Sequence, residues 1–305
     1  MTHGGKSKTK KPQINHLLES GSIKGLQEAK RLTEKHIRYR WKEYSELAQQ
    51  RHEIQDKIKK ALIQTCVPQT IDHWQRAVKY KYGLHPLSTA GSLTDIGGRF
   101  NTGKEVNTEV PSFSGLYIAQ DKDTALQEHL GQIPNDKLTP REIALTNPAS
   151  ETIVSISGKL DKIFDLTKEE TLEPFVKLIK KFKLSLELQT MAKELGLKAA
   201  KLINTQQKLM GSLLDPDWRK LPRLFDIPAN SQIFGYLVFS AGIEGILYPS
   251  KLTQSPCLVL FPKNFPDTDS FIQLDDETPH DKVPNRIDGS NWRICDLSPT
   301  ELLAL

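Results

Sequence analysis

A short stretch of the sequence brings together an arginine, a tyrosine and a glutamate. Arg99 lies in the glycine-rich segment GGRFNTG (97–103), Tyr117 in the apolar run 116–119, and Glu128 shortly afterwards. Glycines permit backbone conformations with positive φ and let a ligand approach the main chain. The arginine guanidinium is a rigid fork of donors that suits phosphate. This spacing indicates an anion-binding corner with a carboxylate beside it.

Three expected elements position these side chains. Residues 74–78 and 116–119 are short and apolar enough to predict strands. Asp121 or Asp123 is suited to cap a helix that carries Glu128. Glu128 could equally be a solvated helix acid, because it lies off the Leu126–Leu130 face of that helix.

The rest of the chain alternates strands and helices without the even rhythm of a doubly wound sheet. Strands are predicted at 142–145, 152–156, 245–250, 257–261 and 271–274. A helical pattern runs over 167–214, begins with a possible capping box at Thr167–Glu170, and is expected to break near Gly196 and Gly211. A further helix passes through residues 235–239. The expected fold class is therefore mixed α/β.

The N-terminal segment carries the positive charge of the protein. Residues 1–70 contain 15 lysines and arginines and 7 acids, whereas the rest of the chain is slightly acidic. Apolar residues at helical spacing predict helix over 14–63, and we place a domain boundary after residue 66. This basic, mostly helical extension (1–66) either packs on the main domain (67–305) or contacts nucleic acid or an anionic membrane through interleaved cations and aromatics.

Composition excludes several classes of protein. The chain has 305 residues, and its three cysteines, Cys66, Cys257 and Cys295, show no metal-ligand spacing. An odd number of cysteines favours a reducing compartment. No apolar run is long enough to span a membrane, and no signal peptide is evident. We therefore expect a cytoplasmic protein without a metal site.

Several blocks, taken in order, resemble the RES domain. They are Trp74-x-Arg76-Ala77, the glycine segment 97–103, the strand 116–119, Thr124-Ala125-Leu126-x-Glu128, residues 242–250 (GIEGILYPS), and Leu258-Val259-Leu260-Phe261. The resemblance covers about residues 70–275. RES domains are named for an arginine, a glutamate and a serine, and are toxins of bacterial toxin–antitoxin pairs.

The resemblance implies an α/β fold like that of ADP-ribosyltransferase toxins, here with a helical N-terminal extension and a helical insertion at about 167–214. It implies an enzyme that cleaves the nicotinamide–ribose bond of its substrate NAD. The ADP-ribosyl group would pass to phosphate or water, so the enzyme would be an NAD glycohydrolase or phosphorylase. The implied partner is an antitoxin with a DNA-binding helix-turn-helix part that covers the active site.

The resemblance also suggests a role for each candidate residue. Glu128 would stabilise the positive charge that builds on the ribose, and Arg99 would bind the pyrophosphate. Arg76 is the second choice for the pyrophosphate, although a strand arginine in an ion pair is an equal alternative. Tyr117 would stack on the nicotinamide or ribose, and Ser250 would hydrogen-bond that part of the substrate; the alternatives are core packing for Tyr117 and an ordinary turn for Ser250.

Three features depart from the family pattern. Cys257 stands where family members often have asparagine, the loop from Asn101 to Ser114 is long, and both the helical stretch 167–214 and the basic extension exceed the family core. Two other functions therefore stay open. One is ADP-ribosyl transfer to a macromolecule recognised by the long loop. The other is a non-catalytic protein that binds nucleic acid or acts as a scaffold through residues 1–66.

Overall fold

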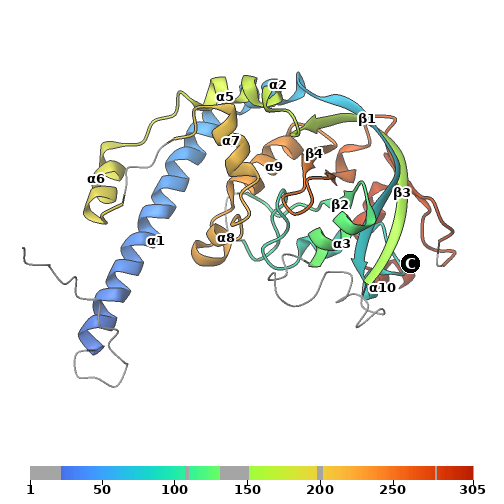
Figure 1. Ribbon diagram of the computed structural model, residues 1–305, viewed down its shortest axis with the longest axis horizontal. Coiled ribbons are helices and arrows are strands. Elements are labelled where there is room, and N and C mark those ends of the chain that lie inside the picture. The colour runs from blue at the N-terminus through green and yellow to red at the C-terminus, as the bar shows by residue number, and fades with distance from the viewer. Residues whose placement is uncertain (1–21, 107–109, 131–150, 198–201, 279, 305) are drawn as a thin grey trace, which may run out of the picture. The chain divides into compact units, whose positions relative to one another are not determined.

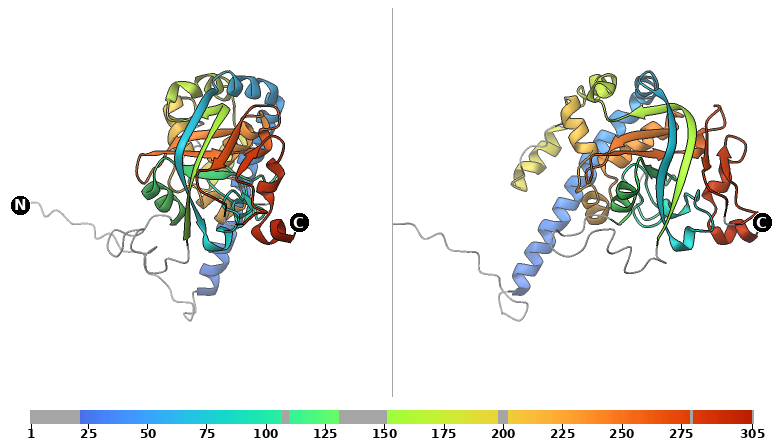
Figure 2. Two further views of the ribbon diagram at one scale, coloured as in Figure 1. Left: turned by 90° about the vertical axis from the view of Figure 1, so that its right-hand side faces the viewer. Right: turned by 45° about the vertical axis from the view of Figure 1, so that its right-hand side comes forward.

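Two long antiparallel strands, β1 (Val67–Lys79) and β3 (Glu151–Asp165), run side by side through the protein and form the frame on which the other strands assemble (Figures 1 and 2). The computed structural model describes residues 22–106, 110–130, 151–197, 202–278 and 280–304. The β1–β3 register shifts between Val67 and Gln69 and again between Ile71 and Trp74, where His73 has a φ of 54°. Such irregularities bend a strand pair and increase its twist.

The remaining strands join these two in the order β1-β2-β5-β4-β3-β6-β7. The pair β3–β4 is parallel and the other pairs are antiparallel. Because β1 also pairs with β3, the strands β1, β2, β5, β4 and β3 close into a ring, and β6 and β7 extend from β3. The bounds are β2 (Leu116–Ala119), β4 (Gly245–Pro249), β5 (Pro256–Leu260), β6 (Phe271–Leu274) and β7 (Arg286–Asp288).

Helices α5, α7 and α9 lie next to one another on one side of β4 and β3 (Figure 1). The α-helices are α1 (Ser22–Glu53), α2 (Gln55–Ile63), α3 (Lys122–Leu130), α5 (Glu173–Ile179), α6 (Leu186–Glu194), α7 (Gln206–Leu213), α8 (Lys220–Phe225), α9 (Asn230–Ser240) and α10 (Pro299–Ala304). The 3₁₀ helices are η1 (Tyr80–Tyr82), η2 (Ala90–Leu93), η3 (Glu169–Leu172), η4 (Pro262–Asn264) and η5 (Trp292–Asp296).

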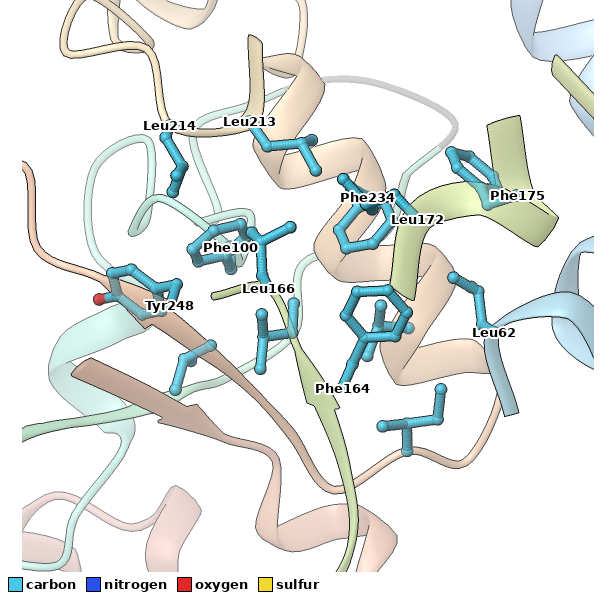
Figure 3. Packing of buried hydrophobic residues seen from close by; sticks show 14 of the residues in the cluster. Leu62, Phe100, Phe164, Leu166, Leu172, Phe175, Leu213, Leu214, Phe234 and Tyr248 are labelled. Atoms are coloured by element: carbon cyan, nitrogen blue, oxygen red, sulfur yellow. The ribbon is translucent and has the colours of Figure 1, made fainter. Parts of the chain in front are cut away.

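The larger of two main hydrophobic clusters lies between these helices and the strands. Figure 3 shows the phenylalanine-rich part of this cluster, in which Phe234 of α9 makes edge contacts with Phe164 and Phe175 at centroid distances of 5.3 and 5.6 Å. Phe100, from the glycine-rich segment, is completely buried in the same cluster and packs against Tyr248 of β4. Hydrophobic packing therefore anchors the segment that carries Arg99.

The described residues form two compact units. One comprises residues 22–45 and 184–197, and the other comprises the remaining described residues. Within the first unit, Tyr39 of α1 is buried against Leu188 and Ala192 of α6, and Lys42 forms an ion pair with Glu187. Helix α2 packs into the main cluster of the second unit, and the domain boundary after residue 66 stays a prediction.

The structure confirms the mixed α/β class and the helical N-terminal region. The predicted strands at 74–78 and 152–156 lie within longer strands, and the strands predicted near 116, 245, 257 and 271 are all present. The predicted strand 142–145 lies outside the described residues.

Two local predictions in the helical stretch were wrong. Gly196, with a φ of 65°, does follow the end of α6, but Gly211 lies inside α7 and does not break it. The Thr167 hydroxyl donates to Asp165 (2.5 Å), and no capping box forms at Thr167–Glu170 because η3 begins at Glu169 without a side-chain cap. Within the part of the chain that the structure describes, no helix is long and apolar enough to cross a membrane.

Candidate active site

A pocket of about 520 Å³ opens between the glycine-rich segment, α3 and the turn after β4. Its wall includes main chain of Gly97 and Gly98 and the side chains of Arg99, Tyr117 and Glu128. The structure therefore brings together the three residues whose types and spacing first suggested chemistry. Further cations and aromatic residues complete the wall: Lys79, Trp218, Arg219, Arg223, Tyr248 and Lys251.

The glycine-rich segment is held by side chains from outside it. Gly98 donates its N–H to Asn101 Oδ1 (3.0 Å), and a Cβ at Gly98 would lie 2.4 Å from Tyr117 Oη. Asn101 is completely buried, and its Nδ2 donates to Ser92 O and Phe113 O. Gln232 of α9 donates to two carbonyls of the segment, Gly98 O and Asn101 O (both 3.1 Å), and to Ile96 O just before it (2.8 Å). The segment is therefore a fixed surface rather than a free loop.

Sequence reasoning did not assign Gln232 a role. It lies more than 130 residues after the segment that it binds. An uncharged glutamine in an apolar helix shows no local sign of such a task, although complete burial of a polar side chain requires hydrogen-bond partners.

Tyr117 acts as a bridge within the site. Its hydroxyl donates to Asn101 Oδ1 (2.8 Å) and accepts from the Phe100 N–H (3.1 Å). Burial raises the pKa of Tyr117 well above its ordinary value, so the hydroxyl stays protonated and keeps donating. One side of the residue lines the pocket, while its polar end fixes the glycine-rich segment.

Glu128 is positioned by Ser250. The Ser250 hydroxyl donates to Glu128 Oε1 at 2.6 Å, and it accepts from the N–H groups of Leu252 (3.1 Å) and Thr253 (3.2 Å). Since those two donors fix the hydroxyl oxygen, its proton is directed at the carboxylate. Ser250 is completely buried and does not line the pocket, whereas Glu128 does.

The helix that carries Glu128 begins as predicted. Asp121 Oδ1 accepts from the Thr124 N–H at 2.8 Å, which caps the start of α3. The Thr124 hydroxyl also lies 2.8 Å from the Thr253 hydroxyl, so the start of α3 and the turn after Ser250 are joined. The Thr124–Thr253 contact near the start of α3 and the Ser250–Glu128 hydrogen bond near its end therefore set the position of Glu128.

Arg99 reaches the pocket with part of its hydrogen-bonding capacity used. Its Nη1 donates to Asp215 O (2.8 Å) and is 3.5 Å from Leu213 O. Nε and Nη2 have no hydrogen bond to the described residues. Those nitrogens remain available to a ligand.

Arg76 lies behind the pocket rather than in its wall. Its Nε, Nη1 and Nη2 donate to Pro86 O (2.8 Å), Tyr117 O (3.0 Å) and Ser88 O (2.7 Å). Burial lowers the pKa of Arg76 to about 10, so the guanidinium stays charged at neutral pH. These bonds tie β2 to the loop that leads into the glycine-rich segment.

Two arginines in the pocket wall were not predicted from the sequence. Arg219 and Arg223 both face the pocket from the start and body of α8. Burial and the neighbouring charges of Arg99 and Arg223 lower the pKa of Arg219. The sequence gives no glycine or strand context around residues 219–223 that would single them out, and only the fold brings them to Arg99.

Cys257 and His129 occupy the remaining positions of interest. Cys257 lines the pocket near the start of β5 opposite Tyr248, and burial and the charge of Glu128 raise the pKa of its thiol. His129 Nε2 lies 2.8 Å from Glu151 Oε2, and burial lowers the pKa of His129 to about 4. The Cys257 thiol is therefore uncharged at neutral pH. Among the described residues, no three histidine, cysteine or acidic side chains are grouped so that they could hold a metal ion.

Comparison with known proteins identifies the family. The model of the RES domain matches residues 73–282, more than two thirds of the chain. The protein belongs to the RES-domain family. The match ends before η5 and α10, so the C-terminal segment of this RES protein lies outside it.

A crystal structure of the M. tuberculosis MbcT–MbcA toxin–antitoxin complex is similar with a TM-score of 0.43 and 14% sequence identity, over 82% of this chain and 96% of that one. A likeness of that size supports no conclusion, and the family assignment depends on the RES-domain match. No curated protein matches the chain.

Proposed function

We propose that this RES protein cleaves the nicotinamide–ribose bond of NAD in the pocket and transfers the ADP-ribosyl group to water or phosphate. The observation that carries the proposal is the Ser250–Glu128 hydrogen bond (2.6 Å), which fixes a carboxylate in the wall of a pocket otherwise rich in cations. A dinucleotide that is anionic at its pyrophosphate and develops positive charge at one ribose matches that arrangement.

The chemistry requires only a few groups. When the bond between ribose C1″ and the pyridinium nitrogen breaks, the electron pair leaves with nicotinamide, which departs neutral and needs no proton. Positive charge remains on the ribose, and a carboxylate placed beside it stabilises that transition state. The incoming oxygen then bonds to C1″, and an attacking water loses its proton to Glu128 or to solvent. A single carboxylate is sufficient.

Other residues would bind and orient the substrate. Arg99 presents its free guanidinium nitrogens next to the main chain of Gly97 and Gly98, where a pyrophosphate can approach closely. Tyr117 offers its ring to the substrate while its hydroxyl holds the segment. Arg76 acts by positioning, since its three donors bind carbonyls of the protein.

The same proposal includes a protein partner and a compartment. The partner would be an antitoxin protein. An antitoxin that covers the pocket would keep NAD out and so inhibit the enzyme. NAD is a cytoplasmic metabolite, and the three cysteines of the chain are free, which agrees with a reducing compartment.

Nicotinamide release from NAD by the purified protein tests the proposal. We expect release with an ADP-ribose or ADP-ribose phosphate product, and a loss of about 100- to 1,000-fold in kcat for Glu128→Gln, which keeps the shape and removes the charge. Asp123→Asn is the matched control, because Asp123 is an exposed acid on the same helix outside the pocket wall.

Three other outcomes would change the conclusion. Label from NAD that ends on protein or nucleic acid would assign ADP-ribosyl transfer to a macromolecule. Val106, Val110 and Phe113 of the described part of the Asn101–Ser114 loop are buried, so these apolar side chains are not available to an acceptor. Equal release by Glu128→Gln and wild type would place the chemistry elsewhere. No release, together with salt-sensitive nucleic-acid binding, would favour a non-catalytic function of residues 1–66.

A further inference from the structure

The pocket holds more positive charge than a dinucleotide pyrophosphate requires. The cations that line it are Lys79, Arg99, Arg219, Arg223 and Lys251, whereas the carboxylates in its wall are Asp95 and Glu128. NAD brings two negative charges at its pyrophosphate and one positive charge at its nicotinamide ring. Bound NAD would therefore leave net positive charge among these side chains, which favours the binding of a further anion.

The excess comes from one short helix. Arg219 is the residue that precedes α8, and Arg223 follows one helical turn later, so the two side chains share a side of the helix. Like charges at this spacing destabilise a helix unless something compensates them. The compensation present is weak, because Arg223 Nη2 is 3.6 Å from Asp95 Oδ2 and both side chains are more than half exposed.

One member of the pair, Arg219, is held in place by an aromatic ring. The Arg219 guanidinium lies 4.5 Å from the ring centroid of Trp218, which is buried against Ile96, the residue before the glycine-rich segment. The residues just before Trp218 supply Asp215 O, which accepts a hydrogen bond from Arg99 Nη1. Leu213 O and Asp215 O thus hold Arg99, and Trp218 holds Arg219, at one wall of the pocket, which reduces the ordering that binding would cost at these two side chains.

We propose that Arg219 and Arg223 form a second phosphate subsite, separate from the pyrophosphate site at Arg99, which binds a phosphomonoester or free phosphate dianion. This inference deepens the proposed function and rests on it for the identity of the neighbouring dinucleotide. Two arginine forks suit the three terminal oxygens of such a group.

The dianion has two possible sources. Free phosphate bound here would be the acceptor: one of its oxygens bonds to ribose C1″ while the C1″–nitrogen bond breaks and nicotinamide leaves with the electron pair. Alternatively the group is the 2′-phosphate of NADP, and the subsite then sets substrate choice without taking part in the bond change.

Binding of inorganic phosphate tests the subsite without any turnover. We would titrate phosphate into the Glu128→Gln protein by calorimetry, with and without saturating ADP-ribose, which occupies the pyrophosphate site. We expect phosphate to bind in both cases, and to bind about tenfold or more weakly to proteins that also carry Arg219→Gln or Arg223→Gln. Lys220→Gln is the matched control, since Lys220 is an exposed cation of α8 that pairs with Asp217 and does not line the pocket.

Kinetics then separates the two sources. If free phosphate is the ligand, phosphate accelerates NAD cleavage in wild type and has no such effect in Arg223→Gln. If the 2′-phosphate is the ligand, wild type prefers NADP over NAD in kcat/KM by about tenfold, and Arg223→Gln does not.

Two results would overturn the inference. Exclusion of phosphate by ADP-ribose would assign the arginines to the pyrophosphate site, and unchanged phosphate affinity in both arginine variants would remove them from phosphate binding altogether. Because the titration requires no cleavage, either result can be told apart from a failure of the proposed function, which would show as absence of nicotinamide release.

Discussion

Ser250 and Glu128 are 122 positions apart in the sequence and are joined by one short hydrogen bond. We expect Ser250→Ala to lower kcat for NAD cleavage by about 10- to 100-fold with little change in KM, because the carboxylate loses a charge-assisted bond that fixes its direction. Steady-state kinetics of nicotinamide release measures both constants.

The matched control for this prediction is Ser112→Ala, which removes an exposed hydroxyl from the loop before β2. Ser112→Ala should keep the wild-type kcat. A Ser250→Ala protein with full activity would show that Glu128 needs no partner, and Ser250 would then be a turn residue only.

At the scale of single elements, we expect replacement of a glycine by alanine to destabilise the glycine-rich segment and to stabilise helix α7. We expect Gly98→Ala to lower the free energy of unfolding by about 1–3 kcal/mol, because the new Cβ would lie 2.4 Å from Tyr117 Oη and 2.6 Å from Asn101 Oδ1. Gly211→Ala should instead raise the free energy of unfolding by about 0.5–1 kcal/mol. Beyond its own helix backbone, no atom lies within 4 Å of the added Cβ, and alanine favours a helix. Urea denaturation measures both changes, and loss of stability in Gly211→Ala would contradict the assignment of Gly211 to a helix interior.

The C-terminal 3₁₀ helix η5 supports the site from outside the matched family region. Asp296 Oδ1 accepts from the hydroxyls of Thr89 (3.0 Å) and Ser114 (2.7 Å), so one carboxylate ties the loop before the glycine-rich segment to the residues before β2. We expect Asp296→Ala to raise KM and lower kcat for NAD cleavage by several-fold each, because the chain on both sides of the glycine-rich segment loses a hydrogen bond. Asp267→Ala, at an exposed acid far along the chain from these contacts, is the control, and equal kinetics in the two variants would deny η5 a role in the site.

The sequence predicts elements whose signal is local. The strand 116–119 follows from its apolar run, and the start of α3 follows from Asp121, because both depend on residues close together in the chain. The ends of helices are harder to predict. Gly211 is tolerated within α7 because its neighbours pack into the core, and rules based on adjacent residues do not include such packing.

The site was predictable only in part for the same reason. Arg99, Tyr117 and Glu128 are neighbours in the sequence and line one pocket. Gln232 and Arg223 reach the same place through α9 and α8, and such long-range placement is decided by packing. The family resemblance supplied Ser250, which the residue pattern alone does not distinguish from a turn serine.

At the scale of the whole molecule, the buried His85 links stability to pH. His85 is completely buried, its Nε2 donates to Ile294 O (2.9 Å), and burial lowers its pKa below the ordinary 6.5. The unfolded chain takes up a proton as pH falls through 6.5, whereas the folded chain does not, so the contribution of His85 to stability is present above that pH and declines below it.

We therefore expect His85→Gln to flatten the fall in unfolding free energy between pH 7 and pH 5 by at most about 1.4 kcal/mol per pH unit. Denaturant titrations at several pH values give the slope, with His52→Gln as the exposed control. A wild-type slope that survives in His85→Gln would assign the acid sensitivity to other groups.

The closed ring of β1, β2, β5, β4 and β3 also limits how another protein can attach. Strand β5 lies between β2 and β4 and is paired with both along its length, so it offers no row of unpaired backbone groups to an incoming chain, whereas β1 pairs with β2 only at Gln75 and Ala119. Among the strands of the described sheet, β7 alone ends the order on the far side of β6, and it is only three residues long, Arg286–Asp288. A partner therefore cannot add a strand beside β5 and gains little by adding one beside β7, so at these two places recognition must use side chains.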